Sequence, residues 1–126
     1  MKSRLMYVEL KTGYSDNGPA WIGQAFYSKS GRTLYFNGLA FSKESRNGGN
    51  HYEILGGDYY WISGVKKDGS NRHWADGGKI QIDKDVVSEY LEKTKLSSLP
   101  NHQFEVVELN NNPPIETLNE YMNIKF

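Results

Sequence analysis

The stretch WISGVKKDGSNRHW, residues 61–74, holds the side chains of this sequence that are best suited to gripping a ligand. Two tryptophans flank three cationic side chains and a histidine, and a pair of tyrosines comes directly before them. Aromatic rings stack on nucleobases or fill protein interfaces, and cations hold phosphate groups. The sequence therefore predicts a binding surface formed by Tyr59, Trp61, Lys66, Lys67, Arg72, His73 and Trp74.

The same stretch also has a purely structural interpretation. Asp68-Gly69 between two β-type segments is a strong signal for a hairpin, in which Trp61 is buried in the core and the two lysines solvate an exposed tip. The alternative places Trp74 and Tyr59 or Tyr60 beside Arg72 as a stacking surface for single-stranded nucleic acid. Residues 1–83 carry eleven basic and eight acidic side chains, which is a weak positive charge for such a partner.

The rest of the sequence lacks the motif spacings typical of catalysis or metal binding. His51, His73 and His102 do not have the spacing of a zinc site, and the sequence has no phosphate-binding loop, dinucleotide fingerprint or nucleophile elbow. Asp83 and Asp85 stand where a strand should give way to a helix, so helix capping explains them. We therefore expect no catalytic residue, no cofactor and no metal, with a small enzyme built from dispersed Asp and His as an alternative.

The composition favours a soluble chain with a core built from aromatic rings. The 126 residues include nine tyrosines, five phenylalanines and three tryptophans, no cysteine, and equal numbers of acidic and basic side chains. The N-terminal apolar run is too short for a signal peptide, and no apolar run approaches the roughly 20 residues of a membrane span. We expect a cytoplasmic protein without a membrane segment, with surplus exposed rings among Tyr14, Tyr27, Tyr35, Tyr59 and Trp74.

Residues 1–83 have the alternating pattern of β-strands. Apolar side chains recur on both faces early in the chain, Ser30-Gly31 predicts a hairpin turn, and Asn37-Gly38 predicts either a type I′ turn or a bulge. The segment SKESRNGGN (42–50) has no periodicity and predicts an exposed loop. In GKIQID (78–83), Ile80 and Ile82 are expected to face the core, while Lys79, Gln81 and Asp83 face solvent.

The period changes to that of a helix after residue 83. Val86, Val87, Tyr90 and Leu91 share one helical face, which predicts a helix over 84–93. QFEVVEL (103–109) predicts a late strand, and the spacing of Ile115, Leu118 and Met122 suggests a short terminal helix.

Together these elements predict a mainly β or α+β fold. We expect a small, strongly bent antiparallel sheet or barrel of five to seven strands, with one or two short helices at its C-terminal side. The chain is expected to form a single domain over 1–126, with a β-rich core (1–83), a helix (84–93) and a strand with a short helical extension (94–126).

Four blocks of the sequence are similar to a group of short uncharacterised bacterial proteins: MYVELKTGYSDNGPAWIG (6–23), SKSGRTLYFNG (28–38), YYWISGVKKDGSNRHWADGGKIQID (59–83) and VVSEYL (86–91). The resemblance covers roughly residues 6–93. Members of the group are often labelled 1-deoxy-D-xylulose-5-phosphate synthase, a thiamine-diphosphate enzyme. Such an enzyme needs a Gly-Asp-Gly segment for magnesium and diphosphate, and this sequence contains none. The resemblance therefore implies no catalytic residues here.

The main functional hypothesis is a non-catalytic, cytoplasmic binding module that contacts a protein partner or a second copy of itself. It is motivated by more aromatic rings than a core of this size readily buries. The nucleic-acid surface near residues 59–74 and the small enzyme with dispersed Asp and His are the alternatives.

Overall fold

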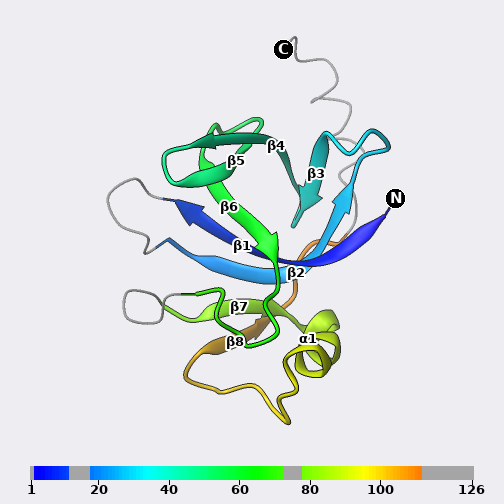
Figure 1. Ribbon diagram of the computed structural model, residues 1–126, viewed down its shortest axis with the longest axis vertical. Helices are drawn as coiled ribbons and strands as arrows, with labels where there is room; N and C mark the ends of the chain where they lie inside the picture. The colour runs from blue at the N-terminus through cyan, green and yellow to red at the C-terminus, as the bar shows by residue number, and fades with distance from the viewer. Residues whose placement is uncertain (1, 12–17, 73–77, 112–126) are drawn as a thin grey trace.

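The computed structural model describes residues 2–11, 18–72 and 78–111 of the chain. The elements in chain order are β1 (Ser3–Lys11), β2 (Ala20–Tyr27), β3 (Thr33–Phe36), β4 (Leu39–Arg46), β5 (Gly49–Glu53), β6 (Tyr59–Gly64), β7 (Ile80–Asp83), a 3-10 turn η1 (Lys84–Val86), α1 (Val87–Thr94) and β8 (Phe104–Val107). The mainly β fold with one short helical segment after residue 83 confirms the predicted fold class (Figure 1).

Strands β1 to β6 form a closed ring. Their order is β1-β6-β5-β4-β3-β2, and β2 pairs again with β1, so every neighbouring pair in the ring is antiparallel. Closure removes the unpaired sheet edges that an open antiparallel sheet would expose. The strongly bent sheet expected from the sequence is therefore a small six-stranded barrel.

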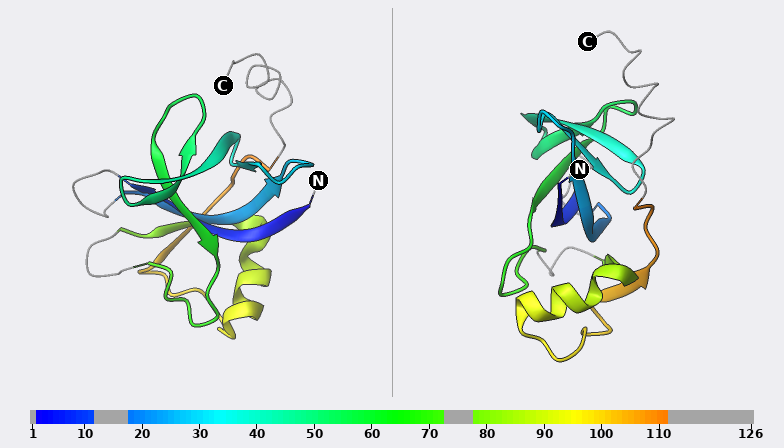
Figure 2. Two further views of the ribbon diagram at one scale, coloured as in Figure 1. Left: turned by 45° about the horizontal axis from the view of Figure 1, so that its top comes forward. Right: turned by 90° about the vertical axis from the view of Figure 1, so that its right-hand side faces the viewer.

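Two further strands branch from the barrel, so the described residues form eight strands rather than five to seven. The first half of β2 pairs with β7, and β7 pairs with β8, in both cases in parallel. A parallel pair needs a crossover connection, and here η1 and α1 supply it between β7 and β8. Figures 1 and 2 show β7, β8 and α1 on one side of the β1–β2 hairpin, with β3 to β6 on the other.

The β1–β2 hairpin is thus buried on both faces, as the early apolar pattern predicted. One face points into the barrel, where Met6 and Val8 meet Phe41 and Ile62. The other face contacts the layer of β7, α1 and β8, with a buried core formed by Leu5, Tyr7, Ala20, Ile22, Val65, Ile80, Ile82, Val86, Tyr90 and Phe104. Packing against these two cores fixes the hairpin, and with it the residues at its two ends.

Two Asn-Gly pairs form tight hairpin turns. Asn37-Gly38 joins β3 to β4 with φ values of 49° and 77°, and Asn47-Gly48 joins β4 to β5 with 54° and 84°. Positive φ at both central positions is the type I′ geometry that matches strand twist. The second pair corrects the loop predicted over 42–50, because that segment is instead a polar, exposed hairpin of β4 and β5.

Asp83 contradicts its predicted exposure, since the structure buries it completely. Its carboxylate accepts a hydrogen bond from the backbone N–H of Asp85 at 3.3 Å and another from Asn111 Nδ2 at 2.6 Å. The residue therefore caps η1, as its place at the junction suggested, and it does so from the interior. The terminal helix predicted around Ile115 to Met122 lies outside the described residues.

Among the described residues, no helix is long and apolar enough to cross a membrane.

Candidate binding surface

An aromatic strip lies on the outer face of the barrel across β5 and β6. Tyr52 and Tyr59 are cross-strand partners, with ring centroids 6.2 Å apart and an interplanar angle of 52°. Trp61 follows two residues after Tyr59 and so shares its face. Its side chain is 42% exposed. We call Tyr52, Tyr59 and Trp61 the aromatic strip.

The exposure of Trp61 corrects the interpretation that placed it in the core. Its neighbours Tyr60 and Ile62 point inward and pack in the barrel core, which leaves Trp61 on the outside. The direction of this alternation is set by pairing with β1, where Tyr60 meets Leu10 and Trp61 meets Glu9. Of the three consecutive large residues of β6, Tyr60 and Ile62 thus lie in the core and Trp61 lies at the surface.

A hydrogen bond from the neighbouring strand fixes one ring of the strip. The Tyr59 hydroxyl donates to Glu44 Oε2 on β4 at 2.5 Å. This bond is the main cause that raises the pKa of Tyr59 above its ordinary value, with burial and the charge of Glu44 acting in the same direction. The Tyr59 hydroxyl therefore keeps its proton, and the hydrogen bond holds the ring in place on the same face as Trp61.

The turn after β6 carries the predicted cations Lys66 and Lys67, and both are exposed. Asp68 accepts hydrogen bonds from the backbone N–H and the hydroxyl of Ser70, and these bonds lower the pKa of its carboxyl group. Asn71 Oδ1 accepts from the Lys66 N–H at 2.7 Å, and its Nδ2 donates to the Gly64 carbonyl at 3.0 Å. Side-chain hydrogen bonds, rather than the backbone hydrogen bonds of paired strands, thus hold the turn after β6 in place.

The predicted Asp68-Gly69 hairpin is therefore wrong within the described residues. Gly69 does adopt the left-handed conformation, with φ 72°, but no strand follows it up to Arg72. The next strand in the described residues is β7, which pairs with β2 and not with β6. His73 and Trp74 lie outside the described residues.

Arg72 is buried, with only 4% of its surface exposed, and it does not belong to the aromatic strip. Its Nη1 contacts Glu9 Oε1 at 3.1 Å, its Nη2 donates to the Gly18 carbonyl at 3.1 Å, and its Nε donates to the Gly78 carbonyl at 3.0 Å. The guanidinium thus ties β1 to the segments that enter β2 and β7.

Glu9 completes this buried cluster. Its carboxylate also accepts a hydrogen bond from the Tyr7 hydroxyl, and Lys11 Nζ lies 2.7 Å from its second oxygen. Burial, with the bond to Glu9 as second cause, raises the pKa of Tyr7 far above its ordinary value. Tyr7 therefore remains a donor, and no buried side-chain polar atom in the described residues lacks a hydrogen-bond partner.

The cluster fits a structural role better than a reaction centre. Glu9 already receives three donors, and the three nitrogens of Arg72 all have acceptors. A general base needs a lone pair and access to substrate, and this carboxylate is 6% exposed. In the described part of the chain, no group of three or more His, Cys, Asp or Glu side chains could hold a metal.

Of the predicted surface residues that the structure describes, Tyr59 and Trp61 lie together, with the two lysines on the adjoining turn and Arg72 apart from them. Sequence reasoning missed Tyr52, because the strand predicted in HYEIL was given no inward and outward face. It also missed Glu9. An acidic residue on a strand face otherwise occupied by Leu5 and Tyr7 was a usable signal, because a charge on an apolar face requires a buried partner.

Comparison of the chain with protein-family models, with curated proteins and with solved structures found no significant match.

Proposed function

We propose that the protein is a non-catalytic binding module that contacts a protein partner through the aromatic strip. The observation that carries this proposal is the exposed Trp61 on the same outer face of β5 and β6 as Tyr52 and Tyr59. Trp and Tyr are enriched at protein interfaces and dominate binding hot spots. We also propose a cytoplasmic location, as the composition led us to expect.

The charges around the strip favour a protein over a nucleic acid. Glu44 of β4 is hydrogen-bonded to Tyr59 of the strip, and the cation expected to meet phosphates, Arg72, is committed to Glu9 and to two backbone carbonyls. Exposed cations remain at Arg46, which interacts with Tyr59, and at Lys66 and Lys67 on the adjoining turn. A partner with an acidic rim around an apolar centre would complement both the rings and this turn.

The test compares two exposed apolar side chains. Trp61→Ala removes the centre of the strip, and Leu96→Ala removes a residue of similar exposure, 40%, beyond the end of α1. Partners captured on the immobilised full chain are quantified by mass spectrometry for the wild type and both variants. Loss of a hot spot of about 2 kcal/mol lowers affinity roughly 30-fold, so Trp61→Ala should lose a partner that Leu96→Ala keeps.

Two further measurements define the partner. Sedimentation of the wild type and Trp61→Ala identifies a second copy of this chain if only the wild type self-associates. Steeply salt-dependent binding of a single-stranded oligonucleotide, weakened by Trp61→Ala, would assign the strip to nucleic acid instead. Equal capture by all three proteins, with no self-association, would overturn the proposal.

A further inference from the structure

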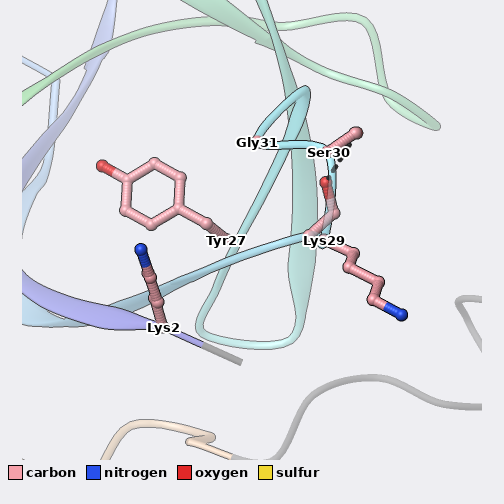
Figure 3. A pocket seen from close by; sticks show the side chains of 6 residues that line it. Lys2, Tyr27, Lys29, Ser30 and Gly31 are labelled. Carbon is pink, nitrogen blue, oxygen red and sulfur yellow. Dashed lines mark hydrogen bonds between the residues drawn. The ribbon is translucent and has the colours of Figure 1, made fainter.

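A basic hollow opens at the end of the barrel where β1 begins and β2 ends. It has a volume of about 760 Å³ and is lined by Lys2, Tyr27, Ser28, Lys29, Ser30 and Gly31 (Figure 3). A second hollow of about 190 Å³ shares Tyr27 and Gly31 and reaches the barrel interior at Met6 and Leu34. It adds Arg32, Lys43 and His51. We call the two together the basic mouth.

Cationic side chains from separate elements meet at this opening. Lys2 precedes β1, Lys29 and Arg32 lie in the β2–β3 turn, and Lys43 belongs to β4. All four are exposed, none of them forms an ion pair with a described residue, and no carboxylate is among the described lining residues. A concave surface lined by one sign of charge concentrates the field and attracts the opposite sign.

His51 adds a proton-accepting nitrogen beside Lys43, its cross-strand partner. The Asn50 carboxamide is fixed, because its oxygen accepts from the Ile62 N–H and its nitrogen donates to the Ile62 carbonyl, each at 2.8 Å. His51 Nδ1 lies 2.8 Å from that oxygen and must therefore donate to it. The neutral ring consequently keeps Nε2 as the nitrogen that can take up a proton.

The uncharged lining consists of an aromatic ring, which suits an apolar part of a ligand, and serine hydroxyls, which can donate a hydrogen bond to it. Figure 3 shows the Tyr27 ring beside Lys2 and close to the β2–β3 turn. In that turn, Ser28 Oγ accepts from the Thr33 N–H at 3.1 Å, and Ser30 Oγ accepts from the Arg32 N–H at 3.3 Å. The two hydroxyls lie 3.4 Å apart, so one proton is used between them and the other can be donated to a ligand.

We propose that the basic mouth binds a small phosphorylated molecule, with its phosphate groups among the cations and its remaining part against Tyr27. Four cations are more than a ligand with a single carboxylate would need to neutralise its charge, and both Arg and Lys bind phosphate oxygens. The volume lies within the roughly 300–1,000 Å³ typical of small-molecule sites. The site is separate from the aromatic strip, which lies on the outer face of β5 and β6.

The direct test is calorimetric titration of the full chain at constant ionic strength with three probes: inorganic phosphate, pyrophosphate and adenosine diphosphate. The double variant Arg32→Ala/Lys43→Ala removes two mouth cations. Its control, Lys66→Ala/Lys67→Ala, removes the same charge from the turn after β6. Wild type and control should bind pyrophosphate or adenosine diphosphate, and the mouth variant should bind at least about tenfold more weakly, or 1.4 kcal/mol.

The outcomes separate the ligand sources. Tighter binding of adenosine diphosphate than of pyrophosphate would show that Tyr27 contributes, and equal binding would assign the site to the phosphate groups alone. The His51 ring protons, followed by NMR, should shift on binding, and Trp61→Ala should leave the affinity unchanged. No saturable binding of any probe up to about 10 mM would overturn the proposal. Equal weakening in the control, or binding only of a single-stranded oligonucleotide, would overturn it as well.

Discussion

Arg72 and Arg32 lie near opposite ends of the β1–β2 hairpin and have opposite surroundings. Arg72 is 4% exposed and has a carboxylate and two carbonyls as acceptors. Arg32 is exposed at the basic mouth, and its guanidinium has no hydrogen bond or ion pair with a described residue. One arginine has its donors satisfied by the fold, and the other has them available.

The difference shows that a cation beside aromatic residues in the sequence is not thereby a ligand contact. Arg72, between two tryptophans in the sequence, was predicted to meet a ligand, yet its partner is Glu9, 63 residues away. Arg32 stands in an ordinary turn sequence and drew no prediction. Burial and the nearest carboxylate decide the role of each cation, and both depend on contacts between distant segments.

The largest expected effect comes from Arg72→Met, which keeps an apolar stem and removes the charge. It leaves Glu9 with less compensation and the carbonyls of Gly18 and Gly78 without their donor. Breaking a buried pair from one side costs about 3–5 kcal/mol, so the free energy of unfolding in urea should fall by that amount. Arg32→Met is the matched control and should stay within about 0.5 kcal/mol. Equal losses in the two variants would abolish the contrast.

A double-mutant cycle sharpens the assignment to Glu9. Glu9→Leu alone leaves Arg72 buried without a counter-charge, whereas Glu9→Leu combined with Arg72→Met replaces the pair by apolar side chains. The double variant should therefore be more stable than the sum of the two single losses predicts, by about 1–3 kcal/mol. Additive losses in urea denaturation would mean that Arg72 acts mainly through Gly18 and Gly78.

Local patterns in the sequence predicted much of the fold. Alternation in β1 predicted two buried faces, the period change at residue 84 predicted η1 and α1, and Asn37-Gly38 predicted a turn or a bulge, of which the structure shows the turn. The hairpin at Asn47-Gly48 was missed, because polar side chains on both flanks hid the alternation, although the Asn-Gly pair was itself the stronger signal. Turn chemistry outweighs hydrophobic period where strands are exposed.

The candidate site was less predictable because it depends on register. Tyr60, Trp61 and Ile62 are all large and apolar, so alternation alone leaves open which of them faces out. Pairing of β6 with β1 settles it, and that pairing spans about fifty residues of sequence. Asp83 is a similar case, since its burial depends on the parallel partner β8 and on Asn111. The basic mouth combines five strands and one turn, and no local pattern joins them.

A smaller effect is expected where like charges meet at the mouth. Lys43→Gln removes one of the four cations gathered there, so stability in a phosphate-free buffer at low salt should rise by up to about 0.5 kcal/mol. Salt screens exposed charges, so the gain should disappear at about 1 M sodium chloride. Lys66→Gln, on the turn after β6, should give no comparable gain. A loss of stability in Lys43→Gln at both salt concentrations would mean that its side chain supports the fold.

The smallest effect concerns His51 and its dependence on pH. Burial, and secondly the charge of Lys43, lower the pKa of His51 below its ordinary value of about 6.5. Other ionisable groups near it are Tyr60, its partner on β6, with Tyr27 and Arg32 in the same hollow, and none of these supplies a negative charge near neutral pH. Between pH 6.5 and the lowered pKa, the unfolded chain therefore binds a proton that the folded chain does not.

Stability should accordingly fall as the pH drops below about 6.5 and level off below the folded pKa, because the slope follows the difference in bound protons. His51→Gln should remove this part of the pH dependence, and His102→Gln, in the exposed loop before β8, should preserve it. Saturating pyrophosphate should also flatten the curve, since an anion in the mouth favours protonation of Nε2 and brings the folded pKa closer to the unfolded value. An NMR titration that places the pKa of His51 in the ligand-free, folded protein at or above 6.5 would contradict these expectations.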